Sequence, residues 1–198
     1  MFDVKDKFYY EAKAKGFRAR SVFKLEEIQQ KHSLVKKGNN VLDLGAAPGS
    51  WTQFVARIVG DGGRVVAVDL QDIEALNLQN VEVYKYDVFS KECEVFLKEK
   101  YGRFDVLLSD MAPKTSGIKD KDQWLSVELG IQCLELADSL LKKGGNMTVK
   151  VFQGSDFNLF WFKFKKKFKI AKVIKPRAVR STSFEVYVVG IGYVGRKE

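Results

Sequence analysis

Acidic residues recur at or near the carboxyl ends of four short segments rich in valine and leucine: Asp43, Asp69, Asp87 and Asp110. Carboxylates at such positions accept hydrogen bonds from hydroxyl and amino groups and attract cations. Asp69 is placed to bind ribose hydroxyls, Asp87 to read an adenine amino group, and Asp110 to lie near a reacting group. A single acid at a strand end often only caps a helix. Four acids at the matching ends of four strands predict a ligand site.

A glycine-containing turn follows the first of these segments, in the run Asp43-Leu-Gly-Ala-Ala-Pro-Gly-Ser-Trp51. Gly45 and Gly49 let the backbone approach a ligand and let a helix begin at once. The loop lacks the Lys-Ser/Thr pair of a P-loop and the GxGxxG spacing of a dinucleotide site, and the carboxylate of Asp43 opposes a phosphate. A ligand with cations and no phosphate fits better, and S-adenosylmethionine, with its ammonium and sulfonium groups, is such a ligand.

A lysine near the carboxyl end of the fifth apolar segment, Lys150, stands in otherwise apolar company. Lys150 either reaches solvent from the end of its strand or serves as a functional amine, and the periodicity of the sequence favours neither interpretation. If the fold brings Lys24 close, two like charges and partial burial favour the neutral amine, which can accept a proton from a ribose hydroxyl. Glu185 is expected to hold or balance both lysines, or to form an ordinary cross-strand ion pair.

These residues need a fold that gathers strand ends, and the chain alternates strand and helix patterns. Apolar runs predict strands at 40–45, 64–70, 81–86, 104–109 and 146–152. The clearest helix spans 123–142, with Gly144-Gly145 as its stop signal. Two β-rich runs, 169–174 and 184–193, predict an antiparallel hairpin at the sheet edge. The pattern predicts an open, doubly wound α/β sheet with one reversed strand, which binds ligands at the carboxyl ends of its strands.

The formal charge of +9 is unevenly distributed along the 198 residues. Residues 163–180 contain nine Lys or Arg and no acid, and the segment before residue 40 contains ten basic residues against five acids. Such blocks attract polyanions, because each neutralised phosphate releases counterions; a merely solvated surface is the alternative. The basic N-terminal segment, residues 1–37, is expected to hold an amphipathic helix around Val22, Leu25 and Ile28. The aromatic residues of 157–168 are expected to pack mostly in the core.

Length and composition suit a single domain over residues 1–198, with 45% hydrophobic and 30% charged residues. No stretch approaches the ~20 apolar residues of a transmembrane helix, and acids interrupt the basic N-terminus. We therefore expect a cytoplasmic protein that does not enter a membrane. Cys93 and Cys133 form no CxxC motif and cannot make a metal cluster with the single histidine, His32. They are interpreted as structural thiols, and no metal site is expected.

Five motifs, in the same order, resemble those of the FtsJ/RrmJ family of RNA ribose 2′-O-methyltransferases, over about residues 7 to 193. They are Arg20-Ser-Val-Phe-Lys24-Leu, Asp43-Leu-Gly-Ala-Ala-Pro-Gly-Ser-Trp51, Ser109-Asp110-Met-Ala-Pro113, Val149-Lys150-Val-Phe-Gln-Gly154 and Ser183-Phe-Glu185-Val-Tyr187. The resemblance implies a class I methyltransferase fold: a Rossmann-like, doubly wound, mostly parallel seven-stranded sheet with one antiparallel edge strand. It also implies S-adenosylmethionine as methyl donor and RNA as substrate.

The family uses a Lys-Asp-Lys-Glu tetrad, and the resemblance assigns it to Lys24, Asp110, Lys150 and Glu185. It implies cofactor contacts at Gly49, Trp51, Asp69, Asp87 and Asp110, to which the loop chemistry described above adds Asp43 and Gly45. In the expected mechanism Lys150 activates the ribose hydroxyl and Asp110 orients the reacting groups. Lys24 and Glu185 set charge and position.

The resemblance leaves two kinds of RNA substrate open. Large-subunit ribosomal RNA, at a uridine, leads because the chain is a bare catalytic domain, and the tRNA anticodon loop is the alternative. Many bacterial members read Gly-Gly-Trp where this chain has Gly49-Ser50-Trp51, and members acting on tRNA often carry Ser there. A tRNA substrate would suggest an accessory protein. A non-catalytic RNA-binding protein would show a broken tetrad, and a methyltransferase for small molecules or proteins would lack the basic blocks; this sequence shows neither feature.

Overall fold

The computed structural model describes residues 4–195, and the ends of the predicted domain, residues 1–3 and 196–198, lie outside this range. Seven strands form one sheet: β1 (Asn40–Leu44), β2 (Arg64–Asp69), β3 (Val81–Lys85), β4 (Phe104–Ser109), β5 (Leu141–Phe152), β6 (Phe168–Ile174) and β7 (Glu185–Tyr193). Their order is β3-β2-β1-β4-β5-β7-β6. The five strands predicted from the apolar runs are present, and the doubly wound α/β class is confirmed.

The first five strands are parallel to one another. Val41, Leu42 and Leu44 of β1 are fully buried, as are Val65 and Val66 of β2. Burial on both faces explains why β1 and β2 read as apolar runs rather than as alternating patterns, whereas the edge strand β3 has no fully buried residue. Because they are parallel, their carboxyl ends meet at one edge of the sheet, where the predicted acids lie.

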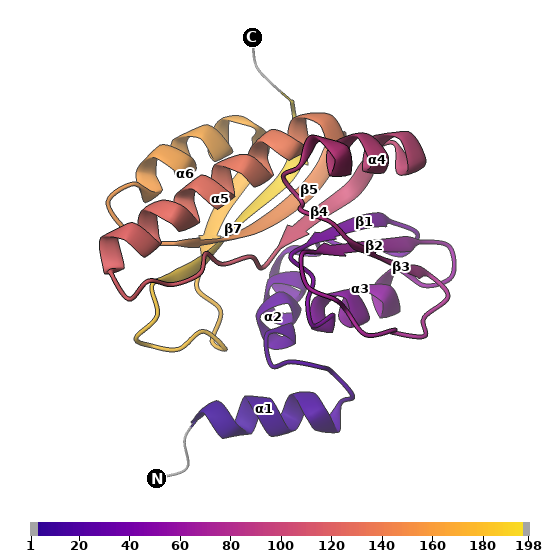
Figure 1. The fold of residues 1–198 in the computed structure, drawn as a ribbon, viewed down its shortest axis with the longest axis horizontal. Coiled ribbons are helices and arrows are strands. Elements are labelled where there is room, and N and C mark those ends of the chain that lie inside the picture. The colour runs from indigo at the N-terminus through magenta and orange to yellow at the C-terminus, as the bar shows by residue number, and fades with distance from the viewer. Residues whose placement is uncertain (1–3, 196–198) are drawn as a thin grey trace.

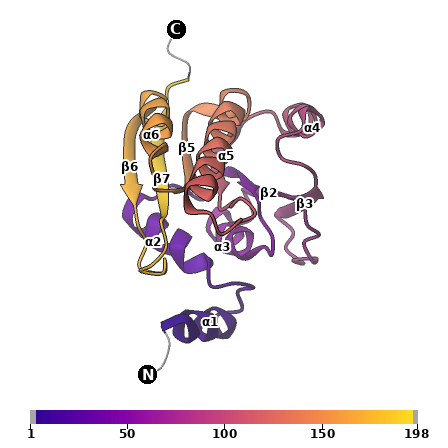
Figure 2. The ribbon, with the colours of Figure 1, turned by 60° about the vertical axis from the view of Figure 1, so that its left-hand side comes forward.

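The described residues form six helices: α1 (Val4–Ala14), α2 (Val22–His32), α3 (Ser50–Val59), α4 (Lys91–Tyr101), α5 (Lys119–Leu140) and α6 (Phe157–Lys166). Helices α2 and α3 cover one face of the sheet, and α4, α5 and α6 cover the other (Figures 1 and 2). Leu25 and Ile28 of α2 are fully buried, which confirms the predicted amphipathic helix. Each face of the sheet therefore has its own apolar core.

The reversed strand does not lie at the edge, where the sequence pattern placed it. Strand β7 pairs antiparallel with β5 on one side and with β6 on the other, so β6 is the edge strand. The predicted hairpin between the last two strands is confirmed. Pairing on both sides explains the continuous burial of Val186, Val188 and Val189, whereas in β6 only Phe168 is buried and the other residues are exposed or half-buried. The hairpin inserts its second strand next to Lys150.

Strand β5 begins earlier than predicted, directly where α5 ends at Leu140. The glycine pair that was predicted to stop the helix lies inside the strand instead. A Cβ at Gly145 would lie 2.8 Å from the carbonyl oxygen of Asp105, so the close approach to β4 requires glycine there. As expected, Phe157, Phe160 and Phe164 of α6 are buried in the core.

Helix α1 lies apart from the sheet, beyond α2 (Figure 1). Its Ala12 packs into a small apolar cluster with Phe23 of α2 and Ala178 of the β6–β7 loop. Arg20 donates a hydrogen bond to the carbonyl oxygen of Ala178 at 2.8 Å. The two basic segments of the chain therefore lie side by side. Within residues 4–195, no helix is both long and apolar enough to cross a membrane.

Candidate active site

A cavity of about 390 Å³ opens at the carboxyl ends of β1, β2 and β4. This volume lies within the range of small-molecule sites. Four of the predicted cofactor residues line it: Gly45, Asp69, Asp87 and Asp110. The remaining walls come from the segments that follow those strands and from α5: Ala47, Leu70, Gln71, Val88, Phe89, Met111, Ala112, Lys114 and Leu129. We call it the acidic cavity.

Two of its acids are fixed by backbone amides. Asp69 accepts hydrogen bonds from the amides of Ala47, in the glycine loop, at 2.9 Å and of Gln71 at 2.8 Å. Asp87 accepts one from the amide of Phe89 at 3.0 Å. The N-cap of the following helix, α4, is Ser90, whose hydroxyl accepts from a backbone amide of the first turn. Asp87 is therefore not the helix cap, and its carboxylate is available to a ligand.

The glycines of the loop have backbone conformations that other residues rarely adopt. Gly45 has φ +71°, and a Cβ there would lie 2.1 Å from Cγ of Met111. Gly49 has φ +104° and would bring a Cβ within 3.2 Å of Leu76. Gly45 lines the acidic cavity, whereas Gly49 packs against the segment after β2. The two glycines thus let the loop pass close to its neighbours on both sides.

Asp43 lies behind the loop and does not line the cavity. It is 1% exposed, and its carboxylate accepts a hydrogen bond from the Thr52 hydroxyl at 2.7 Å. Burial, with smaller contributions from the charges of Asp110 and Asp69, raises the pKa of Asp43 to about 7. Asp43 therefore supports the loop from behind, through its hydrogen bond with Thr52, and its carboxylate does not reach the acidic cavity.

Trp51 and its neighbour Ser50 also face away from the acidic cavity. Trp51 is buried and donates a hydrogen bond to the carbonyl oxygen of Ser21 at 2.9 Å. The hydroxyls of Ser50 and Ser21 lie 2.9 Å apart. The serine that distinguishes this loop from Gly-Gly-Trp thus contacts the N-terminal segment, just before α2.

The predicted tetrad is assembled as two ion pairs. Lys24 Nζ lies 2.6 Å from Glu185 Oε1, and Lys150 Nζ lies 3.1 Å from Asp110 Oδ1. Lys150 also donates to the main-chain carbonyl of Asp110, and its side chain is only 8% exposed. Both lysines therefore have an acidic partner, and the alternative of a solvent-reaching strand end does not describe Lys150.

A tyrosine that sequence reasoning gave no role connects the two pairs. The hydroxyl of Tyr187 lies 2.5 Å from Asp110 Oδ1 and 3.0 Å from Glu185 Oε1, and its single proton can be donated to one of them at a time. Burial, together with the two carboxylates, raises the pKa of Tyr187 well above 10, so the phenol keeps its proton. Tyr187 follows Glu185 by two residues in β7, so the two side chains face the same side of the sheet, and this spacing is the signal that the sequence carries.

An arginine counted in the sequence only as a basic residue supports the acidic cavity from outside. The guanidinium of Arg18 donates to the carbonyl oxygens of Pro48 at 3.0 Å, Glu74 at 2.7 Å and Ala75 at 2.9 Å. Pro48 belongs to the glycine loop, and the other two belong to the segment after β2. Arg18 therefore joins the N-terminal segment to two loops that form the acidic cavity.

A second cavity, of about 490 Å³, opens on the other side of the tetrad. Its lining comes from α2, the residues preceding it and the β6–β7 loop: Arg20, Ser21, Lys24, Ala178, Val179, Arg180, Thr182, Ser183 and Glu185. Three cations lie against one acid in this lining. We call it the basic cavity. Asp110 lines the acidic cavity and Glu185 the basic one, and Tyr187 contacts both carboxylates.

Neither cysteine lines the acidic or the basic cavity. Cys93 and Cys133 are free and buried, and burial raises the pKa of Cys93 to about 11 and that of Cys133 to about 12. Thiols of this kind remain protonated and unreactive. In the part of the chain that the structure describes, no group of three or more His, Cys, Asp or Glu side chains is arranged to hold a metal ion.

The sheet order, with β7 reversed and acids following the ends of parallel strands, defines the class I methyltransferase fold. The particular family follows from comparison with known proteins. The chain belongs to the FtsJ-like methyltransferase family, whose model matches residues 17–193. This membership confirms the predicted family and enzyme class, a methyltransferase that uses S-adenosylmethionine.

Relatives cover nearly the whole chain. It is 45% identical over 190 residues to the ribosomal RNA large subunit methyltransferase E of Syntrophobacter fumaroxidans, covering 96% of each chain. It is 39% identical to the protein of that name from Methanosphaera stadtmanae, covering 98% of this chain and 96% of the other. The crystal structure of a ribosomal RNA methyltransferase from Plasmodium falciparum matches with a TM-score of 0.81 and 26% identity, covering 91% of this chain and 100% of that chain.

Proposed function

We propose that this protein transfers a methyl group from S-adenosylmethionine to the ribose 2′-hydroxyl of large-subunit ribosomal RNA, at a uridine. The observation that carries the proposal is the meeting of an acidic and a basic cavity at the complete tetrad. The similar proteins from Syntrophobacter fumaroxidans and Methanosphaera stadtmanae, both named large-subunit ribosomal RNA methyltransferases, support ribosomal RNA. A non-catalytic RNA-binding protein with this fold is not favoured, because the tetrad is complete and its members are paired: Lys24 with Glu185 and Lys150 with Asp110.

The acidic cavity suits the methyl donor chemically. Its carboxylates can accept hydrogen bonds from ribose hydroxyls and amino groups, and they balance a ligand that carries an ammonium and a sulfonium. We assign ribose binding to Asp69 and adenine binding to Asp87, with Asp110 nearest the reacting group. When bound, S-adenosylmethionine supplies an electrophilic methyl group.

The protein's part in the reaction is to place and activate the hydroxyl. In our proposal Lys150 first loses its ammonium proton to solvent, and the neutral amine then accepts the proton of the 2′-hydroxyl. Asp110 and the Tyr187 hydroxyl hold Lys150 and the ribose in line. Lys24, paired with Glu185 in the basic cavity, positions the nucleotide and balances charge. Alignment of two bound reactants lowers the barrier even without strong acid or base catalysis.

The basic cavity suits the RNA backbone. It is lined by Arg20, Lys24 and Arg180, and it lies where the two basic segments of the chain meet. RNA affinity is therefore expected to fall steeply between about 50 and 200 mM salt, because neutralised phosphates release counterions. An RNA binding constant that barely changed over this range of salt would contradict the proposal that the basic cavity binds RNA phosphates.

Methyl transfer from labelled S-adenosylmethionine tests the proposal directly. The acceptors are large ribosomal subunits, naked ribosomal RNA and tRNA, and the product nucleosides are analysed for 2′-O-methyluridine. We expect label in the large-subunit fraction. Label confined to tRNA would replace this substrate with the anticodon-loop alternative, for which an accessory protein would be sought. Label in none of them, despite tight cofactor binding, would refute the proposed activity.

We further propose that the reaction takes place in the cytoplasm, where ribosomal RNA is assembled into subunits. RNA is the partner that this proposal requires, and it requires no protein partner.

A further inference from the structure

An exposed aromatic residue lies in the sequence between two residues of the basic cavity and has no role in the proposed reaction. Phe184 lies between Ser183 and Glu185, which both line that cavity, and it is 47% exposed. Single exposed apolar residues are common on protein surfaces. The position and the neighbours of this ring therefore carry the argument.

The backbone of Phe184 is held at the carboxyl end of β5. Its carbonyl oxygen accepts a hydrogen bond of 2.8 Å from the amide of Gln153, three residues after Lys150. Because side chains alternate along an extended chain, Phe184 faces the opposite side of the sheet from Glu185. The ring therefore lies close to the tetrad in sequence and register, on the side of α5.

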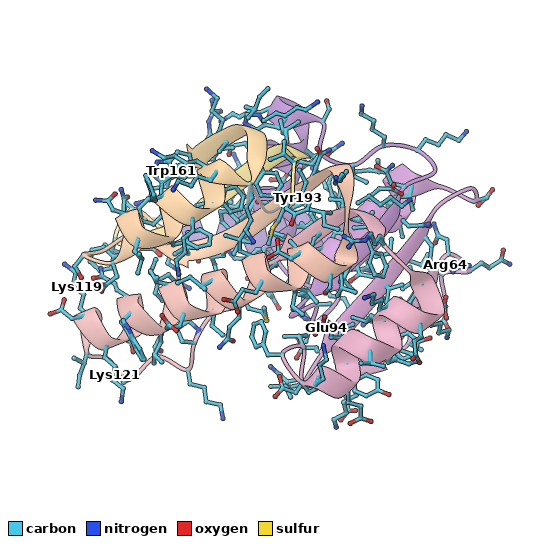
Figure 3. All side chains as sticks on the ribbon, turned by 90° about the horizontal axis from the view of Figure 1, so that it is seen from above. Arg64, Glu94, Lys119, Lys121, Trp161 and Tyr193 are labelled. Carbon is cyan, nitrogen blue, oxygen red and sulfur yellow. The ribbon has the colours of Figure 1, made fainter. Side chains whose placement is uncertain are left out.

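A lysine is positioned over the ring. Lys119 Nζ lies 4.4 Å from the centroid of Phe184, and Figure 3 shows Lys119 at the start of α5, at one end of the molecule. The contact orients the aromatic ring and places a positive charge beside it. An exposed π surface next to an ammonium matches the two parts of a nucleotide, its base and its phosphate.

We infer that Phe184 and Lys119 form a nucleobase-stacking site for the RNA substrate. A base at or next to the methylated nucleotide stacks on the ring of Phe184, and Lys119 binds an adjoining phosphate. Stacking of a base on an aromatic side chain tolerates any sequence, because every base has a π face. This inference rests on the proposed function, and it adds a positioning contact outside the tetrad.

The test compares the kcat/KM for methyl transfer to large ribosomal subunits isolated from cells in which the gene for this chain is deleted. The variants are Phe184→Ala, Phe184→Leu and Phe184→Tyr. Loss of one stacked base is expected to lower kcat/KM about five- to one-hundred-fold for the Ala and Leu variants. The Tyr variant keeps a π face and is expected to stay near wild type. Lys119→Ala is expected to flatten the salt dependence of RNA binding by about one phosphate contact.

Phe162 provides a matched control. It is 51% exposed and has Lys166 Nζ 4.0 Å from its ring centroid, but it lies on α6, which lines neither the acidic nor the basic cavity. Phe162→Ala is expected to leave kcat/KM unchanged. The affinity for S-adenosylmethionine, measured by calorimetry, is expected to be the same in every variant, because Phe184 does not line the acidic cavity.

Three results would overturn the stacking site: wild-type kcat/KM in Phe184→Leu, an equal loss in Phe162→Ala, or a parallel loss of cofactor affinity in the Phe184 variants. The first result would mean that any apolar side chain suffices at position 184. The second would mean that exposed aromatic residues contribute wherever they lie, and the third that the substitution disturbs the fold. These failures differ from failure of the proposed function. If the wild-type protein methylated no subunit RNA, both would be refuted; if it did and Phe184 made no difference, only the stacking site would fall.

Discussion

Replacing Asp43 by Asn is expected to flatten the loss of stability that the wild-type protein suffers as pH rises. Burial raises the pKa of this carboxyl from 3.8 to about 7. A carboxyl whose pKa is higher in the folded state than in the unfolded state contributes stability below about pH 3.8, and that contribution is lost as the pH rises to about 7. At about 1.4 kcal/mol per pKa unit, ionising Asp43 costs about 4 kcal/mol in all, of which about 2 kcal/mol falls between pH 5 and 7.

The assay is urea unfolding of wild type and Asp43→Asn at pH 5, 6, 7 and 8. Asn keeps an oxygen that can accept a hydrogen bond from the Thr52 hydroxyl. Any fixed cost of burying its amide changes the unfolding free energy by the same amount at every pH. The difference in unfolding free energy, variant minus wild type, is therefore expected to grow by about 3 kcal/mol from pH 5 to 8. Asp61→Asn, at an exposed residue of the α3–β2 turn, controls for removing one negative charge. Parallel pH profiles for wild type and Asp43→Asn would refute the reasoning.

Three further predictions concern the site itself. Lys150→Ala is expected to lower turnover by about 10²- to 10⁴-fold while leaving cofactor affinity nearly intact, since Lys150 does not line the acidic cavity; joint loss in rate assays and calorimetry would indicate a structural role. Tyr187→Phe is expected to lower kcat roughly tenfold or more without changing either KM, because a hydrogen bond to a carboxylate contributes about 1.5 to 3 kcal/mol; an unchanged kcat would show that the bridge is dispensable. Arg18→Ala is expected to raise the KM for S-adenosylmethionine, and Arg18→Lys is expected to raise it less. Arg57→Ala is the control and is expected to leave this KM unchanged, because Arg57 contacts the carbonyl of Lys15 and neither cavity loop. Equal effects of the two Ala variants would mean that N-terminal packing alone is involved.

The tetrad could be predicted because each member belongs to a short motif whose place at a strand or helix is itself predictable. Lys150 lies near the end of a strongly apolar strand, and Asp110 follows another. Parallel strands bring such ends together without further information. The order of the elements thus predicts that Lys150 and Asp110 lie close together, whereas the tetrad as a whole, with Lys24 and Glu185, was assigned by the resemblance to the family's motifs.

Other parts of the site depend on packing that residue spacing does not encode. Asp43, Gly45 and Trp51 belong to one sequence motif, with Asp43 in β1 and Trp51 in the first turn of α3, yet of these three only Gly45 lines the acidic cavity. The side chains of Asp43 and Trp51 are buried, and they contact Thr52 of α3 and Ser21 before α2 respectively. The position of β7 inside the sheet is a long-range choice of the same kind, and the bridging contact of Tyr187 follows from it.

The buried charges explain why the four residues belong together. An ionised side chain taken out of water is tolerated only with a partner, and removing one partner leaves the other uncompensated. The site balances two lysines with two carboxylates, and the neutral phenol of Tyr187 contacts both acids. In a chain with a formal charge of +9, this balance keeps the tetrad, which we propose as the reaction centre, neutral between an acidic cavity and a basic one. In our proposal the excess positive charge binds RNA and takes no part in the methyl transfer.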